Sequence, residues 1–274
     1  MTATGAGAPP RPRAGRQRVP FALLAPAGLG LLFLILPLLG LLVRAPWATL
    51  PQRLTEPAVL TALRLSLQCA TLATLLCVAF GVPLAWLLAR VEFPGRRLVR
   101  ALVTVPLVLP PVVGGVALLL VFGRRGLLGE WLDSTFGVTL PFTTTGVVVA
   151  EAFVAMPFLI IAVEGALRGA DSRYEEAAAT LGAGRWTTFT HVTLPLVAPG
   201  IAAGAVLCWA RALGEFGATI TFAGNYPGTT QTMPLAVYLA LETDLDAAIV
   251  LSLILLAVSV AILAGLRDRW ITSP

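Results

Sequence analysis

Six long apolar segments constrain what this chain can fold into. They are Val19–Val43, Leu60–Ala89, Leu98–Phe122, Gly146–Leu167, Leu196–Phe222 and Ala247–Leu266. A helix needs about 20 mostly apolar residues to cross the hydrocarbon core of a bilayer. Lipid offers no hydrogen-bond partners to the backbone, so such segments cross as helices. The sequence therefore predicts an all-α integral membrane protein with six transmembrane helices.

The composition excludes a water-soluble globule. Only 12% of the residues are charged and 57% are hydrophobic, and the mean hydropathy is +0.88. A soluble domain carries about 25% charged residues. This chain has too little polar surface to cover a soluble fold, so we expect the lipid bilayer to surround it.

The N-terminal end differs from the rest. Residues 1–18 are rich in Gly, Pro, Ala and Arg, and we expect them to form a disordered cytoplasmic tail. The segment Val19–Val43 is too long for the core of a signal peptide, and no clear cleavage site follows it. We expect an uncleaved first span, and a transmembrane domain over residues 19–274.

The arginines indicate how the spans are oriented. All 19 basic residues are Arg, and the net charge is +5. With the N-terminus inside, thirteen lie in cytoplasmic segments and four outside, which favours cytoplasmic termini by the positive-inside rule. The thirteen are Arg11, Arg13, Arg16, Arg18, Arg90, Arg96, Arg97, Arg100, Arg168, Arg173, Arg185, Arg267 and Arg269; the four are Arg44, Arg53, Arg124 and Arg125. We predict a multi-pass protein of the cell (inner or cytoplasmic) membrane, and no nucleic-acid partner.

Several kinds of chemistry lack their residues here. Cys69, Cys77 and Cys208 lie in apolar runs with no C-x-x-C spacing, and His191 is the only histidine. The phosphate-binding pattern G-x-x-x-x-G-K-[ST] is absent, because the chain has no Lys. We expect no catalytic residues, no metal site and no cofactor. If ATP drives this protein, another chain binds it.

The loop between the fourth and fifth spans carries the clearest pattern. An acidic first turn and an alanine body predict a short helix over Asp171–Leu181, ended by Gly182 and Gly184. A second short helix is expected over Arg185–Val192, with Pro195 separating it from the fifth span. The slim alanine helix could enter a groove of a partner.

The string E-A-A-x-x-L-G-A, followed by F-x-x-V-x-L-P-x-x-x-P-G-I, resembles the EAA loop of ATP-binding-cassette (ABC) importer permeases. The resemblance implies the type I importer permease fold, called MetI-like, and a coupling helix that docks into the ATPase. It places the coupling loop at residues 169–195. The residues expected to contact the ATPase are Glu176, Ala177, Ala178, Leu181, Gly182, Ala183, Phe189, Leu194 and Pro195.

A second stretch bears on the cargo. R-A-L-G-E-F-G-A-T-I-T-F-A-G-N, from Arg211 to Asn225, and the following P-G-T-T-Q-T-x-P resemble molybdate permeases, whose sulfate and tungstate relatives are similar here. The run Pro106–Gly129 resembles the same group, so the likeness covers about residues 60–266. It implies molybdate import, with sulfate, thiosulfate or tungstate as alternative cargo.

The same stretch supplies candidate pathway or gate residues: Arg211, Glu215, Thr219, Thr221 and Asn225. Hydroxyls and amides can donate to a tetrahedral oxyanion, but these threonines could equally serve helix packing. Arg211 and Glu215 are four residues apart and could pair, either as a gate or as a structural pair. The prolines Pro106, Pro110 and Pro111 could kink the third span or break it along a pathway.

The family resemblance also implies partners. We expect a homodimer, two cytoplasmic ATPase subunits and an extracytoplasmic oxyanion-binding protein, working by alternating access with ATP hydrolysis on the separate ATPase. An ion-driven secondary transporter is the alternative from another class, and it requires midplane carboxylates for coupling. Glu215 is the serious candidate for such a site, and Arg211 lies beside it.

Overall fold

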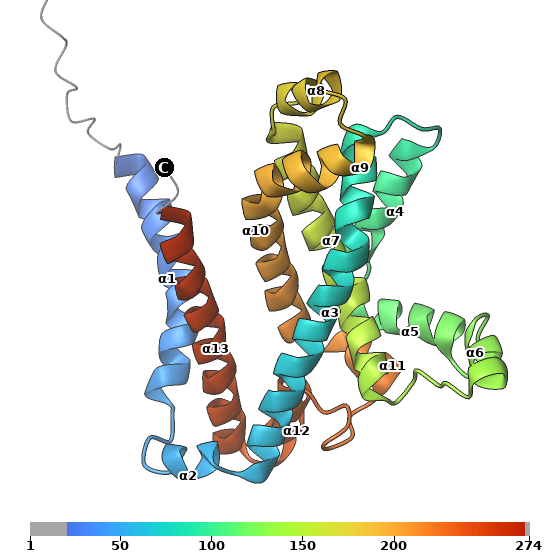
Figure 1. The fold of residues 1–274 in the computed structure, drawn as a ribbon. Coiled ribbons are helices and arrows are strands. Elements are labelled where there is room, and N and C mark those ends of the chain that lie inside the picture. The colour runs from blue at the N-terminus through green and yellow to red at the C-terminus, as the bar shows by residue number, and fades with distance from the viewer. Residues whose placement is uncertain (1–20, 272–274) are drawn as a thin grey trace, which may run out of the picture. The chain divides into compact units, whose positions relative to one another are not determined.

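The computed structural model describes residues 21–271, and within that range every regular element is a helix (Figure 1). The chain divides into two units, residues 1–45 and 46–274. The expected tail over residues 1–18 lies outside the described residues. The all-α prediction is confirmed.

The first unit contains one long apolar helix, α1 (Phe21–Val43). Its segment Leu23–Val43 has a mean hydropathy of 2.4, and its large apolar side chains are exposed. Exposed leucines along a whole helix suit a lipid environment. Pro26 and Pro37 lie inside the helix without ending it. The first predicted span is confirmed over its described part.

The second unit contains the remaining elements. In chain order they are α2 (Leu50–Leu54), α3 (Pro57–Arg90), α4 (Arg96–Val108), α5 (Pro111–Phe122), α6 (Gly129–Phe136), α7 (Thr144–Gly169), α8 (Arg173–Thr180), α9 (Arg185–Thr188), the π-helical turn η1 (Phe189–Thr193), α10 (Leu194–Leu213), α11 (Gly217–Ala223), α12 (Met233–Thr243) and α13 (Leu245–Ile271).

The core of this unit lies between α3, α7 and α10, and α7 is the most buried of the long helices. The contacting faces carry many small residues, among them Ala70, Ala73, Ala85, Ala152 and Ala155. Small side chains let transmembrane helices approach closely, so that packing rather than hydrophobicity holds them together. These three helices form the frame on which the loops and short helices are placed.

Five of the six predicted spans correspond to long apolar helices: α1, α3, α7, the run from α9 to α10, and α13. The predicted third span, Leu98–Phe122, is not one straight helix, because the helix direction turns by 118° between α4 and α5. Leu109 and Pro110 are extended, with ψ of 133° and 132°. Each precedes a proline, which disfavours the helical conformation, so the helix breaks there.

The predicted fifth span, Leu196–Phe222, is also too long at its C-terminal end. Helix α10 stops at Leu213, and Gly214, Glu215 and Phe216 lead into the separate helix α11. The reason is local: the Glu215 carboxylate accepts the Ala218 N–H in the first turn of α11, which stabilises the start of a new helix after Glu215.

Two ends of the second unit matter for function (Figure 1). The α8 end carries α8, α9 and the C-terminus of α3, and the α12 end carries α2, α12 and the N-terminus of α3.

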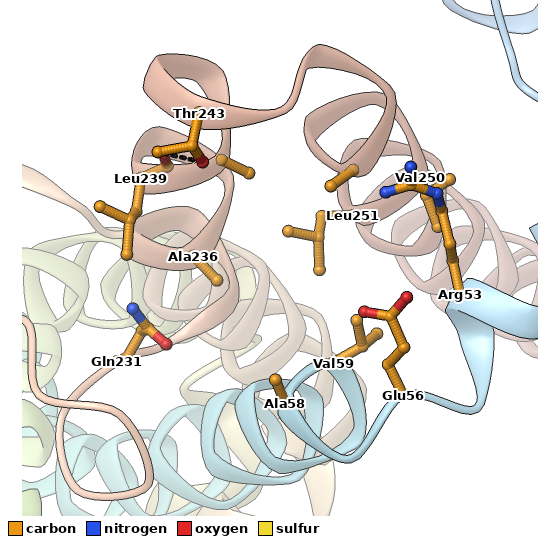
Figure 2. A pocket seen from close by; sticks show the side chains of 12 residues that line it. Arg53, Glu56, Ala58, Val59, Gln231, Ala236, Leu239, Thr243, Val250 and Leu251 are labelled. Carbon is orange, nitrogen blue, oxygen red and sulfur yellow. Dashed lines mark hydrogen bonds between the residues drawn. The ribbon is translucent and has the colours of Figure 1, made fainter.

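At the α12 end, Arg53 of α2 pairs with Asp244 at 2.8 Å, beside a pocket of about 200 Å³ that Glu56 and Gln231 also line (Figure 2). The hydrogen bond from Arg53 lowers the pKa of Asp244. The pair fastens α2 to the corner between α12 and α13.

Candidate functional site: an exposed loop and a buried corner

Helix α8 forms much as its sequence predicts. The Asp171 carboxylate accepts a hydrogen bond from the Arg173 backbone N–H at 3.0 Å. Gly182 ends the helix with a left-handed φ of +84°, and the Ala183 N–H bonds back to the Ala178 carbonyl at 3.0 Å. The helix spans Arg173–Thr180, slightly shorter than the expected Asp171–Leu181.

The second half of the loop differs from expectation. Gly184 is the residue before α9, whereas the sequence predicted that it would help to end α8. The helix also does not break at Pro195. The helical conformation continues from Arg185 through η1 into α10. Pro195 directly follows the π-helical turn, in which the Leu194 N–H bonds to the Phe189 carbonyl, so the irregular turn accommodates the proline without a break.

The predicted ATPase-contacting residues of the loop are largely solvent-accessible. Glu176, Ala177, Leu181, Gly182 and Pro195 are exposed; Ala178, Ala183, Phe189 and Leu194 are half-buried. The Leu181 side chain is 88% exposed, and Trp186, which the sequence analysis did not single out, is 76% exposed. Large apolar side chains beside polar ones on an exposed loop are typical of a contact surface.

One loop residue that sequence reasoning missed faces the bundle. Glu175 accepts a hydrogen bond from the Thr193 hydroxyl at 2.9 Å and pairs with Arg90 of α3 at 3.3 Å. Neighbouring Glu176 is exposed instead. The helical period supplies a signal, because adjacent residues of a helix point about 100° apart. The fold was needed to show which acid turns inward.

The α10–α11 corner is buried and polar. Glu215 is 1% exposed; its Oε1 accepts the Ala218 N–H at 2.9 Å, and its Oε2 pairs with Arg211 at 2.5 Å. The possible pairing of Arg211 with Glu215 is thus present. Oε1 is hydrogen-bonded, whereas Oε2 contacts Arg211 as an ion pair without hydrogen-bond geometry.

The other candidates lie on different sides of α11. Thr219 is fully buried, and no other described residue bonds to its hydroxyl. Thr221 donates to the Gly217 carbonyl of its own helix at 2.8 Å. The side-chain oxygen of Asn225 is buried and likewise has no partner within residues 21–271. The structure therefore pairs Arg211 with Glu215, whereas the hydroxyls of Thr219 and Thr221 bond to neither of them.

Close helix contact fixes the position of α11. A Cβ atom added at Gly115 of α5 would lie 2.6 Å from the Thr221 Cβ and 2.9 Å from the Ala218 carbonyl oxygen. Such distances are too short for any side chain, so α5 can pack here only through glycine. The bend between α4 and α5 brings this glycine face onto α11.

Glu151 of α7 is a second residue that the site prediction omitted. It is 1% exposed, and its Oε2 has no hydrogen-bond partner among the described residues. An ionisable residue inside an apolar span is itself a signal of function, because burying a charge there is expensive. Its position inside the span Gly146–Leu167 was visible in the sequence, but its full burial was not.

Comparison with known proteins identifies the family. Residues 81–273 match the model of the "Binding-protein-dependent transport system inner membrane component" family. The chain belongs to this family. It is therefore a permease, the membrane component of a transport system, as its EAA loop and its apolar helices had indicated.

Individual relatives of the family match most of the chain. The "Molybdenum transport system permease protein ModB" of Mycobacterium tuberculosis strain H37Rv is 48% identical over 244 residues, covering 89% of this chain and 92% of the relative. The protein of the same name from Escherichia coli K12 is 45% identical, covering 80% and 95%. The E. coli K12 "Sulfate transport system permease protein CysT" is 39% identical, covering 86% of each.

Solved structures show the same fold. A chain of the bacterial ABC transporter that imports the acidic polysaccharide alginate superposes with a TM-score of 0.75 at 20% identity, over 92% of this chain and 96% of that one. A chain of the inward-facing MetNI methionine ABC transporter gives a TM-score of 0.61 at 17% identity, over 80% and 100%. The predicted MetI-like importer permease fold is confirmed.

Proposed function

We propose that this permease carries molybdate across the cytoplasmic membrane by alternating access, as a homodimer within an ABC importer. The observation that carries the cargo assignment is the 48% identity to a molybdenum transport permease over 89% of the chain. ATP hydrolysis belongs to separate ATPase subunits, and an oxyanion-binding protein delivers molybdate from outside.

The coupling loop, residues 169–195, supports the ATPase as a partner. Its slim alanine helix projects at the α8 end, and Leu181 and Trp186 present exposed apolar area next to the exposed Glu176. Apolar anchors surrounded by polar groups are the usual composition of a docking surface. In this proposal the ATPase binds α8, and closure of the ATPase dimer moves the loops of the two permease copies together.

The orientation follows from the same partner. An ATPase that uses cytoplasmic ATP requires the α8 end to face the cytoplasm. The excess of arginine in the segments assigned to that side supports this orientation, with both termini inside. The α12 end, with the Arg53–Asp244 pair, then faces the binding protein.

The pathway is proposed to pass beside α11. Thr219 and Asn225 each carry a buried polar atom without a partner in the described part of the chain. Burying an unpaired polar atom costs about 1–3 kcal/mol, so a hydrogen bond formed in another state of the transport cycle would offset this cost. We assign the Thr219 hydroxyl to a transient hydrogen bond that it donates to the oxyanion when the helices open. The Asn225 carbonyl oxygen can only accept, so a contact of Asn225 with the oxyanion would use its amide N–H groups instead. Arg211 and Glu215 hold the corner, and Thr221 packs against α5.

Sulfate is the second candidate cargo, because the chain is also 39% identical to a sulfate permease. Thiosulfate and tungstate share the same tetrahedral oxyanion chemistry. All four would meet the same hydroxyl and amide donors in the permease, so competition among them is part of the test.

The test is uptake into vesicles that contain the permease and its ATPase, with the binding protein outside. We expect ATP-dependent, vanadate-sensitive uptake of radiolabelled molybdate, competed by unlabelled tungstate and much less by sulfate. Stronger competition by sulfate would overturn the cargo assignment. Uptake driven by a proton gradient without ATP would instead establish the ion-driven secondary transporter.

A further inference from the structure

Two acids of α8 have different surroundings, and this difference points to a second connection between the coupling loop and the transmembrane core. Glu176 is exposed, whereas Glu175 is half-buried against the bundle. Its carboxylate lies 3.3 Å from an Arg90 guanidinium nitrogen, and the two side chains are 20% and 19% exposed. Arg90 is the last residue of α3, which crosses the core and reaches the α12 end.

Further contacts surround this ion pair. Thr193 is 2% exposed, and its hydroxyl donates to the same Glu175 oxygen at 2.9 Å. Arg90 also donates to the Ala170 carbonyl at the end of α7 at 3.5 Å. One turn before Arg90, Trp86 packs edge-on against Phe189 with ring centroids 5.6 Å apart. Since Trp86 and Arg90 are four residues apart, they share one face of α3.

The loop side of these contacts is a single irregular element. Phe189 and Thr193 are the two ends of the π-helical turn η1, which joins α9 to α10. Such turns insert an extra residue into a helix and are frequent at functional sites. A groove of about 410 Å³ lies among these residues and is lined also by Glu92 and Arg185. The loop therefore contacts the bundle here through a few side chains and not through a continuous packed interface.

We propose that Arg90, Glu175 and Thr193 are positioning residues that transmit the movement of α8 to α3, beside the covalent connections from the loop to α7 and α10. The inference rests on the proposed function, because it assumes that the ATPase moves α8. The chain joins α8 covalently to α7 before it and, through η1, to α10 after it, but not to α3. The ion pair makes α3 follow as well, and α3 leads directly to the α12 end.

The experiment compares Glu175→Gln with Arg97→Gln in the complete transporter. Glu175→Gln removes the charge and keeps the size of the side chain. Arg97 lies at the same end, is exposed, and forms no ion pair within residues 21–271. Three quantities are measured: ATPase co-purification, ATP hydrolysis stimulated by the loaded binding protein, and molybdate transported per ATP hydrolysed.

We expect Glu175→Gln to lower the molybdate transported per ATP about tenfold while ATPase co-purification stays at the wild-type level, since coupling energies correspond to about 5–150-fold effects. Arg97→Gln should leave all three quantities unchanged. The double variant Arg90→Glu, Glu175→Arg should recover most of the ratio, because it restores an opposite-charge pair across the groove. Thr193→Val should lower the ratio less than Glu175→Gln.

A merely structural role would reduce the amount of folded transporter and leave the ratio unchanged. An unchanged ratio in Glu175→Gln, or a double variant no better than either single one, therefore overturns the inference. Failure of the proposed function is distinguishable, because wild-type protein would then show no ATPase co-purification or no ATP-dependent uptake.

Discussion

The coupling loop and the α10–α11 corner carry the two sets of residues singled out from the sequence. The two regions differ in how far their side chains are exposed. Leu181 of the loop is 88% exposed, whereas Glu215 of the corner is 1% exposed. An exposed side chain adds little to the stability of the fold, so its effect depends on a partner. A buried, paired side chain holds the fold itself. We therefore expect loop variants to lose binding and corner variants to lose stability.

The largest expected effect is that of Glu215→Ala. The change removes the acceptor of the Ala218 N–H in the first turn of α11 and leaves the Arg211 guanidinium, whose side chain is 27% exposed, without its partner. Breaking a buried ion pair from one side costs about 3–5 kcal/mol. The melting temperature in detergent should fall clearly, whereas Glu242→Ala, at an exposed glutamate of α12, should not change it. Lost transport with an unchanged melting temperature would make Glu215 a gate residue.

The next effect is that of Gly115→Ala, because the added Cβ would meet the Thr221 side chain and the Ala218 carbonyl. Overpacking of this kind destabilises by about 1–3 kcal/mol. Gly165→Ala in α7 is the matched control, since nothing lies within 4 Å of its Cβ position. The melting temperature should fall for the first variant and stay or rise for the second. Equal melting temperatures would show that α5 and α11 are not in close contact.

In the loop, Leu181→Ala should weaken binding of the ATPase about tenfold, the effect expected for an apolar anchor worth roughly 1.4 kcal/mol. The melting temperature of the permease alone should not change. Leu127→Ala removes a leucine that is 85% exposed outside the loop and should leave ATPase binding intact. Titrating ATPase onto permease in lipid nanodiscs measures both. A lower melting temperature for Leu181→Ala would contradict the expectation that loop variants lose binding and not stability.

The smallest effect is that of Asp244→Asn at the surface of the α12 end. The pKa of Asp244 is below its ordinary value because Arg53 donates to the carboxylate. The pair thus stabilises the folded state above the ordinary pKa of 3.8, and this contribution disappears as pH falls through the lowered value. The melting temperature of the variant should be slightly below that of the wild type, and this difference should stay constant from about pH 8 to about pH 5. A difference that shrinks within this window would contradict the assignment.

Apolarity predicted most of the fold, and the deviations have local causes. The sequence located the long helices because lipid selects for length and composition. It left open whether prolines kink or break the third span. Pro106 remains inside α4, and only the successive prolines 110 and 111 break the helix, since two successive residues are then held extended.

The sequence predicted the part of the site whose residues follow one another in the chain. It did not predict the contacts between segments that are distant in the sequence. The EAA pattern located the exposed loop, because its residues follow one another in sequence. The partners of Glu175, namely Arg90 and Thr193, lie 85 and 18 residues away in the sequence. The full burial of Glu151 depends likewise on helices that pack around α7. No local pattern could supply these contacts.

The most direct test of the account is the side of the membrane on which Leu181 lies and what covers it. Cys69, Cys77 and Cys208 are all fully buried, so a cysteine introduced at position 181 or 127 can be labelled selectively. We predict that a membrane-impermeant maleimide labels L181C only from the cytoplasmic side, that added ATPase slows this reaction, and that L127C reacts only from outside. Labelling of L181C from outside, or at a rate that the ATPase does not change, would contradict the account.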